Sequence, residues 1–293
     1  MHRLNGSKLF IASFGLWALV QCSAAEQQSP DSGGLSIRQQ LSKAGAADVS
    51  GDFENANSIY LKLTQKHPDS AEAWAAWGEH LRFYAHDGKA AAEAFNKALG
   101  APQKNATASA YAYRGLGELA AKDQHDDAAI EFFKQSLAAL PLSDTHRSLC
   151  HLYCRQKNFK AAADHARQAV ELDPKDPIAR LLYAAQLLRA EDRAEGQRQF
   201  EKALAEAGVD DEGKAKSPVH CCVYYNAAGF LGVIGKNEAA LNMLQRFFET
   251  PNHLHLTRAE IESDADFEGL KETTAFKKLL DQYFPKASEA TSK

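Results

Sequence analysis

The sequence predicts an all-α protein built as a solenoid of helical hairpins, and three observations support this. The first is composition. The 293 residues include 52 Ala but only 9 Pro and 18 Gly, and alanine loses no side-chain entropy in a helix. The second is a column of small residues that recurs about every 34 positions. The third is a mostly bulky apolar column one helical turn later. This composition argues against an all-β sandwich or barrel, a collagen-like chain and a multi-span membrane protein.

Residues 1–25 are predicted to be a secretory signal peptide. Arg3 and Lys8 precede an uncharged run at 9–20, and small residues at 22–25 offer a cleavage site. As a helix the run would span about 18 Å, too short for a bilayer core of about 30 Å. We therefore expect export to the periplasm or the cell exterior, with no transmembrane span in the mature chain. The alternative is an uncleaved anchor or a buried N-terminal helix.

Cys22 raises the alternative of a lipid anchor. The residues before it look like a bacterial lipobox, although Gln21 departs from the small residue expected there. Removal of residues 1–25 takes away Arg3 and Lys8 and no acid. The mature chain then has 32 basic and 38 acidic side chains, a net charge of -6 instead of -4. This balance gives no electrostatic footprint for nucleic acid, so we expect no nucleic-acid partner.

A short polar linker at 26–36 leads into the repeats, which cover residues 37–252. The first small column consists of Ala56, Ala91, Ala129, Ala162, Gly196 and Ala240. A second small column, twelve or thirteen positions earlier, consists of Ala44, Gly78, Gly117, Cys150, Ala184 and Ala228. The bulky column, four positions after the first, reads Tyr60, Phe95, Phe133, Ala166, Phe200 and Leu244. We expect the small columns to let two antiparallel helices approach closely and the bulky column to fill the seam to the next hairpin.

The spacing divides the repeat region into about six hairpins. They are predicted at 37–70, 71–105, 110–142, 143–176, 177–210 and 221–252. The second, third and fourth are the clearest. After Pro251 the spacing stops, and residues 253–285 are expected to form capping helices that close the open end of the solenoid. Residues 286–293 are expected to be a flexible tail.

These columns resemble the tetratricopeptide repeat family. The motifs that carry the resemblance are Trp74–Trp77-Gly78–Leu81, Ala91–Phe95, Leu116-Gly117–Ala129–Phe133–Pro141 and Leu149–Tyr153–Ala162–Pro174. The closing segment resembles that of bacterial exported members. The resemblance implies a right-handed superhelical solenoid whose first helices line a concave groove. It also implies a protein or peptide partner, and neither catalysis nor a cofactor is expected.

Mapped onto this chain, the groove should be charged and aromatic in its first half and apolar in its second. The expected partner-binding residues are Glu72, Glu79, Arg82, Phe83, Tyr111, Arg114, Glu118, Arg147, His151, Arg155, Arg189 and Tyr225. Arginine suits bidentate recognition of carboxylates. Two alternatives stay open: the charged half forms internal ion pairs on a solvated face, and the closing helices fold back over the apolar half. The Lys, Asn and Arg clamp that some family members use for chaperone tails is absent.

The mature chain has four cysteines that are candidates for a metal or redox site together with nearby histidines: Cys150, Cys154, Cys221 and Cys222. They lack the Cys-x-x-Cys spacing of zinc sites. The plainer interpretation is that they are small buried apolar residues.

The leading hypothesis is a non-catalytic exported scaffold that binds its partner in the concave groove. The sequence contains no His-Glu-x-x-His arrangement, nucleophile elbow or phosphate-binding glycine loop. The alternatives are a Cys/His metal or redox protein on the same scaffold, and a structural component of an envelope assembly that binds through its convex face.

Overall fold

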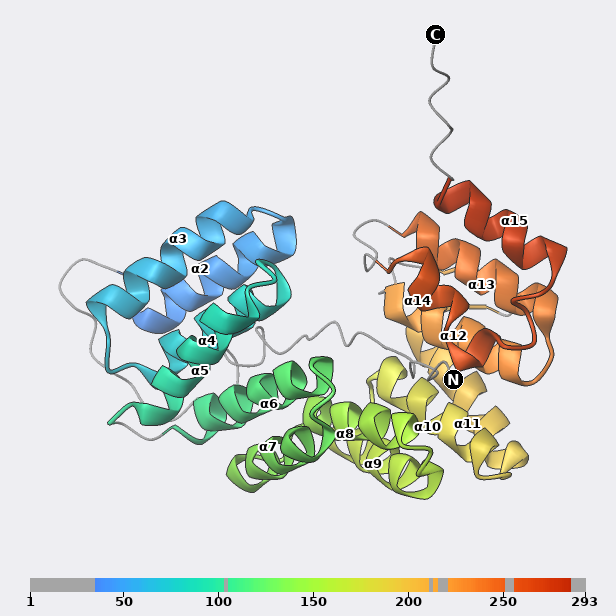
Figure 1. Ribbon diagram of the computed structural model, residues 1–293, viewed down its shortest axis with the longest axis horizontal. Coiled ribbons are helices and arrows are strands. Elements are labelled where there is room, and N and C mark those ends of the chain that lie inside the picture. The colour runs from blue at the N-terminus through green and yellow to red at the C-terminus, as the bar shows by residue number, and fades with distance from the viewer. Residues whose placement is uncertain (1–34, 103–104, 211–212, 216–220, 251–255, 286–293) are drawn as a thin grey trace, which may run out of the picture. The chain divides into compact units, whose positions relative to one another are not determined.

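The structure is a computed structural model that describes residues 35–102, 105–210, 213–215, 221–250 and 256–285. The predicted signal peptide, Cys22, nearly all of the linker and the C-terminal tail lie outside these residues. The described part contains 14 α-helices and no β-strand (Figure 1). No helix within it is long and apolar enough to cross a membrane. The prediction of an all-α solenoid of hairpins is confirmed.

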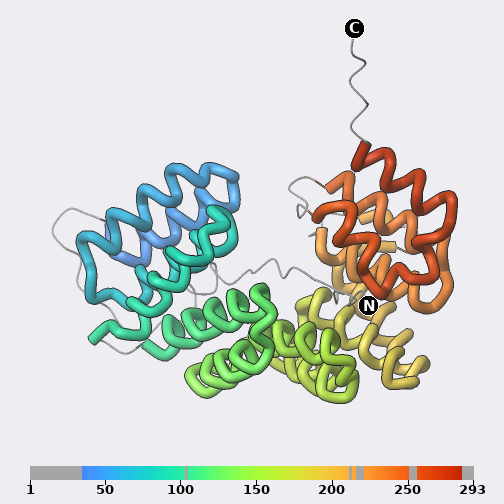
Figure 2. The backbone as a smooth tube through the Cα atoms, in the orientation of Figure 1, coloured from blue at the N-terminus to red at the C-terminus, as the bar shows by residue number. Residues whose placement is uncertain are grey.

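The α-helices follow one another as antiparallel pairs, as the backbone trace in Figure 2 shows within each part of the chain. The pairs are α2 (Ile37–Ser50) with α3 (Phe53–Lys66), α4 (Ala71–Phe83) with α5 (Gly88–Gly100), α6 (Ala106–Lys122) with α7 (Asp126–Ala139), α8 (Ser143–Arg155) with α9 (Phe159–Leu172), α10 (Pro177–Arg189) with α11 (Arg193–Ala207), and α12 (Cys221–Val233) with α13 (Asn237–Glu249). The closing segment consists of α14 (Arg258–Glu262), the 3₁₀ helix η1 (Ala265–Phe267) and α15 (Thr274–Tyr283). The described helices form two compact units that divide after Ser148, within α8, and we call them the N-terminal and C-terminal units.

The turn inside each hairpin has the same backbone form. One residue with positive φ stands directly before the N-cap of the second helix; these residues are Gly51, His86, Gln124, Lys157, Glu191 and Gly235. In four of the six turns the N-cap is Asp or Asn, and its side chain accepts a hydrogen bond from a backbone N–H in the first turn of that helix. Such caps satisfy donors that the helix itself leaves unpaired. The short turns therefore hold the two helices of each hairpin antiparallel.

One helix begins earlier than the sequence pattern indicates. The third hairpin is predicted from residue 110, but α6 begins at Ala106. The Asn105 side chain accepts a hydrogen bond from the backbone N–H of Ala108, over 2.9 Å, and so caps the helix four residues ahead of the predicted boundary.

Glycines and phenylalanines pack against each other within hairpins of the N-terminal unit, and the Phe95 ring also reaches the next hairpin. The Phe95 ring of α5 lies against Gly78 of α4 and Gly115 of α6, and a Cβ on Gly78 would come within 2.5 Å of the ring. Phe133 lies in the same way against Gly117, and a Cβ on Gly117 would come within 2.6 Å of the Phe133 ring. Both rings are buried. The predicted complementarity between the small and bulky columns is thus present here, because only a residue without a side chain leaves room for an aromatic ring.

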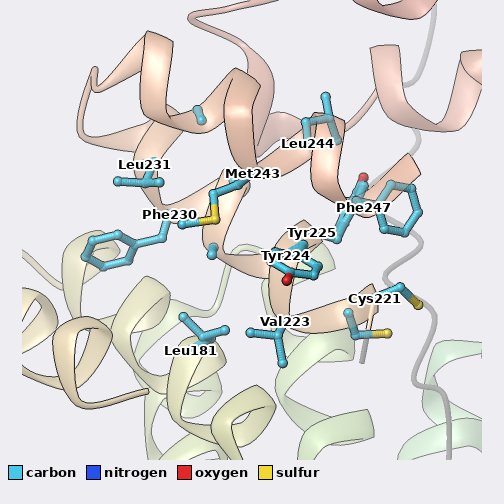
Figure 3. Close-up of a cluster of buried hydrophobic side chains, with 14 of the residues drawn as sticks. Leu181, Cys221, Val223, Tyr224, Tyr225, Phe230, Leu231, Met243, Leu244 and Phe247 are labelled. Carbon is cyan, nitrogen blue, oxygen red and sulfur yellow. The ribbon is translucent and has the colours of Figure 1, made fainter. Parts of the chain in front are cut away.

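A continuous buried apolar cluster in the C-terminal unit extends from α10 to α15 and includes the closing segment. Side chains of α12 and α13 gather there with Leu181 of α10 (Figure 3). Phe200 stacks on Phe230 with ring centroids 4.2 Å apart. In the closing segment Ile261, Phe267, Phe276 and Leu280 are all fully buried in the same core. The closing segment therefore covers the last hairpin.

Candidate functional site

Charged side chains from the first helices of three hairpins form one ion-pair network in the N-terminal unit. We call Glu79, Arg82, Arg114, Glu118, Asp144 and Arg147 the first-helix ion cluster. Arg82 contacts Glu79 and Glu118, each at 2.8 Å. Arg114 lies 3.2 Å from Glu79, 3.5 Å from Glu118 and 3.7 Å from Asp144. Arg147 pairs with Asp144 at 2.6 Å. Three arginines and three carboxylates make the cluster neutral and join α4, α6 and α8.

Arg114 is the centre of the cluster and is completely buried, as is Glu79. Burial acts to lower the pKa of Arg114, but the carboxylates of Glu79, Asp144 and Glu118 outweigh it and raise that pKa above its ordinary value. The Tyr111 ring lies 5.1 Å from the guanidinium carbon, as a cation–π partner. The guanidinium of Arg114 therefore stays charged and contacts its own chain.

The residues predicted to bind a partner differ in their exposure to solvent. Glu79, Tyr111, Arg114 and Arg147 are buried, whereas Glu72, Arg82, Phe83 and Glu118 are partly exposed. The Glu72 carboxylate accepts a hydrogen bond from Asn105 over 2.7 Å. His151 and Arg155 are partly exposed on the part of α8 that belongs to the C-terminal unit. In the charged half, the arrangement corresponds to the internal ion pairs that the sequence left open as an alternative.

The last two predicted residues, Arg189 of α10 and Tyr225 of α12, are engaged by the closing segment. Arg189 forms an ion pair with Asp266. The Tyr225 hydroxyl donates a hydrogen bond to Asp264 over 2.8 Å, and the Tyr225 and Phe267 rings meet edge to face at 5.5 Å. The closing segment thus folds back over this part of the apolar half, as the second alternative states.

A buried polar trio in the N-terminal unit was missed by sequence reasoning. Asp48 of α2 accepts a hydrogen bond from the Tyr60 hydroxyl over 3.1 Å, and its other oxygen lies 2.7 Å from Nδ1 of His80. All three are buried. The trio ties α2, α3 and α4 together. A signal for it exists in the sequence, since Asp48 and His80 lie on helix faces that are otherwise mostly apolar.

Of the four cysteines in the described helices, Cys150, Cys221 and Cys222 are buried and Cys154 is partly exposed. None of the four forms a disulfide. Cys150 packs with Ala162 and Ala166, and a hydrogen bond with Cys154, together with burial, raises its pKa well above the usual value. Cys154 in turn donates to Gln186 over 3.0 Å. Among the described residues no group of three or more His, Cys, Asp or Glu side chains is arranged to hold a metal ion. A raised thiol pKa opposes both metal binding and nucleophilic reactivity.

Asp264 makes the stability of the C-terminal unit depend on pH. Burial, reinforced by the neighbouring Asp266, raises the pKa of Asp264 to about 7, whereas an aspartate in an unfolded chain has a pKa near 3.9. The folded state therefore binds a proton at Asp264 more tightly than the unfolded state does. The stabilisation of the folded state by this proton is complete below about pH 4 and is lost as pH rises towards 7. We expect the unit to lose about 2–3 kcal/mol of unfolding free energy between pH 5 and pH 8.

Asp264→Asn tests this expectation, since it keeps the shape and cannot ionise. Urea unfolding followed by far-UV circular dichroism should show a pH-dependent transition in the unsubstituted protein that becomes nearly flat in the variant. Trp74 and Trp77 are the tryptophans of the described chain and both belong to the N-terminal unit. Their fluorescence therefore serves as an internal control. An equal pH dependence in both proteins would show that Asp264 is not its source.

No protein-family model matches the sequence, and no curated protein matches it. Solved structures do resemble it. The Cut9–Hcn1 hetero-tetramer of the APC/C aligns over 87% of this chain with a TM-score of 0.57 and 16% identity, and the chain spans half of the length of that protein. PilW, a widely conserved type IV pilus biogenesis factor, aligns over 73% of this chain and 94% of its own, with a TM-score of 0.54 and 17% identity.

PilF of Pseudomonas aeruginosa aligns over 80% of this chain and 92% of its own, with a TM-score of 0.51 and 16% identity. All three are tetratricopeptide repeat proteins. At these identities the similarity concerns the fold, and it agrees with the helix pairs described above. The chain has the tetratricopeptide repeat fold.

Proposed function

We propose that this protein is an exported, non-catalytic scaffold that binds a protein or peptide partner through the first helices of its hairpins. The observation that carries the proposal is the first-helix ion cluster. It fixes the partly exposed side chains of Arg82 and Glu118 through buried partners below them. Binding groups that are already ordered lose less conformational entropy when a partner arrives. The partly exposed Glu72 and Phe83 lie on α4 with Arg82.

In this proposal ten of the twelve predicted residues divide into two roles, and Arg189 and Tyr225, which contact the closing segment, have neither. The partly exposed residues contact the partner; they are Glu72, Arg82, Phe83, Glu118, His151 and Arg155. The buried residues position them; they are Glu79, Tyr111, Arg114 and Arg147. Export is supported by the predicted signal peptide, and an envelope location by the similarity to PilW, which is a pilus biogenesis factor.

Site-specific photo-crosslinking in cells tests the proposal. A photoreactive amino acid at Glu72 or Phe83 of the full chain should give a discrete adduct with one protein. Glu131 and Lys134, exposed on the second helix α7, are the matched control sites and should give none. The cross-linked protein should begin near residue 26, as expected after removal of the signal peptide.

The adduct formed at Glu72 should also weaken when Phe83→Ala is introduced and persist when Glu131→Ala is introduced. Adducts that form only from Glu131 and Lys134 would instead support a structural role through the convex face. An absence of adducts from all four sites would contradict the proposed scaffold.

A further inference from the structure

The short turn Asp264–Phe267 of the closing segment is held by residues of two different hairpins. Asp266 pairs with Arg189 of α10, and Asp264 accepts from Tyr225 of α12. Asp264 also accepts a hydrogen bond from the backbone N–H of Asp266 over 3.0 Å, which fixes the two carboxylates on one turn. The turn therefore reaches past the last hairpin to the one before it.

Two glycines on α12 shape the surface that receives this turn. A Cβ on Gly232 would come within 2.7 Å of the backbone oxygen of Asp266, and one on Gly229 within 2.9 Å of its carboxylate. They lie on one side of the helix, three positions apart. Any side chain at Gly229 or Gly232 would therefore collide with the turn. Only glycine at these two positions lets the backbone of the turn approach α12 this closely.

The surface thus presents the guanidinium of Arg189, the hydroxyl and ring edge of Tyr225, and two glycines that allow a peptide backbone to approach closely. We call Arg189, Tyr225, Gly229 and Gly232 the turn receptor. Phe267, the residue after the second carboxylate, is fully buried against Tyr225. The chemistry that fits the receptor is an acidic turn followed by an aromatic residue, with the pattern Asp-x-Asp-Phe.

We propose that the turn receptor is a binding site for an acidic aromatic turn on a partner protein, and that Asp264–Phe267 occupies it as an intramolecular ligand that the partner displaces. The inference rests on the proposed scaffold function and names the chemistry of a partner for the second, apolar half of the predicted groove. The chemistry of the partner is inferred from the Asp264–Phe267 turn, which occupies the turn receptor in this structure.

A tethered ligand competes strongly with a free one. Short connections give effective concentrations in the millimolar range, and the unsubstituted protein should therefore bind a free acidic turn only weakly. Weakening the internal ligand at Asp266 should open the receptor to a peptide in solution. Arg189 should then be required, because it holds the second carboxylate.

The probe is a fluorescent peptide with the sequence of residues 256–284, added to the full chain. We expect Asp266→Ala protein to bind it about tenfold more tightly than the unsubstituted protein. Binding should be lost when Arg189→Ala is added to Asp266→Ala, or when the peptide itself carries Asp266→Ala. Asp281→Ala is the matched control. It removes an exposed carboxylate of the same segment, which pairs with Arg258 instead, and it should bind like the unsubstituted protein.

Hydrogen exchange on the unsubstituted protein supplies a readout that needs no variant. Excess peptide should speed amide exchange in residues 264–270 and leave α4 unchanged. The inference is overturned if Asp266→Ala protein binds no better, if binding survives Arg189→Ala, or if Asp266→Ala protein dimerises without the peptide, which would make a second copy the occupant. Loss of adducts at Glu72 and Phe83 with the peptide result intact would reject the scaffold function alone. The reverse pattern would reject only the turn receptor.

Discussion

Replacing Arg114 with methionine is expected to destabilise the N-terminal unit by about 3–5 kcal/mol. Methionine keeps much of the side-chain volume and removes the charge. The completely buried Glu79 and the partly buried Glu118 and Asp144 would then share only two arginines, and a net negative charge would remain next to the buried Glu79. Breaking a buried ion pair from one side is costly for this reason, although the intact pair contributes little. Urea unfolding followed by tryptophan fluorescence measures the change in the N-terminal unit directly.

Two further variants separate charge balance from packing. Adding Glu79→Gln to Arg114→Met restores neutrality and should recover at least about 1 kcal/mol of the loss. Lys134→Met, the same change at an exposed position of α7, should alter stability by no more than about 0.5 kcal/mol. If Arg114→Met proved as harmless as Lys134→Met, the ion cluster would have no role in holding α4, α6 and α8 together.

The hairpins could be predicted from the sequence because their signal is local. A small residue and the aromatic ring that packs on it, such as Gly78 and Phe95, lie within one repeat, and the repeat occurs often enough to be seen. The start of α6 was misplaced because it depends on one capping side chain, Asn105, in a stretch where the spacing between repeats is irregular.

Five of the six residues of the first-helix ion cluster are on the list predicted from the sequence, but the sequence does not show which of them pair with one another. Arg114 was identified as an inner-face residue, but its burial depends on Glu79 and Asp144, which lie 35 positions before it and 30 after it. The ion pair between Arg189 and Asp266 spans 77 positions. Such pairs require the register of several stacked hairpins, and no spacing rule within one repeat contains that information. The sequence could therefore leave open, for each half of the predicted groove, whether its residues bind a partner or contact other residues of the chain.

The seam at Phe95 provides the second large expected effect. Gly78→Ala should stabilise α4 by about 1 kcal/mol on helix propensity alone, yet we expect a net loss of about 2 kcal/mol from overpacking. The new Cβ would lie 2.5 Å from the Phe95 ring, which Gly115 confines from the other side. Gly100→Ala is the matched control, since that glycine is also helical and a Cβ added to it would meet no other atom within 4 Å; it should be neutral or stabilising.

Phe95→Leu tests whether the ring is the cause of the Gly78→Ala loss. Alone it should destabilise the unit, because the shorter side chain leaves a cavity. Combined with Gly78→Ala it should cost at least about 1 kcal/mol less than the sum of the two single changes. Strict additivity in tryptophan-monitored unfolding would mean that Gly78 is required for some other reason. A smaller combined loss would show that Gly78 in the small column makes room for Phe95 in the bulky column. The recurrence of these two columns is the pattern from which the fold could be predicted.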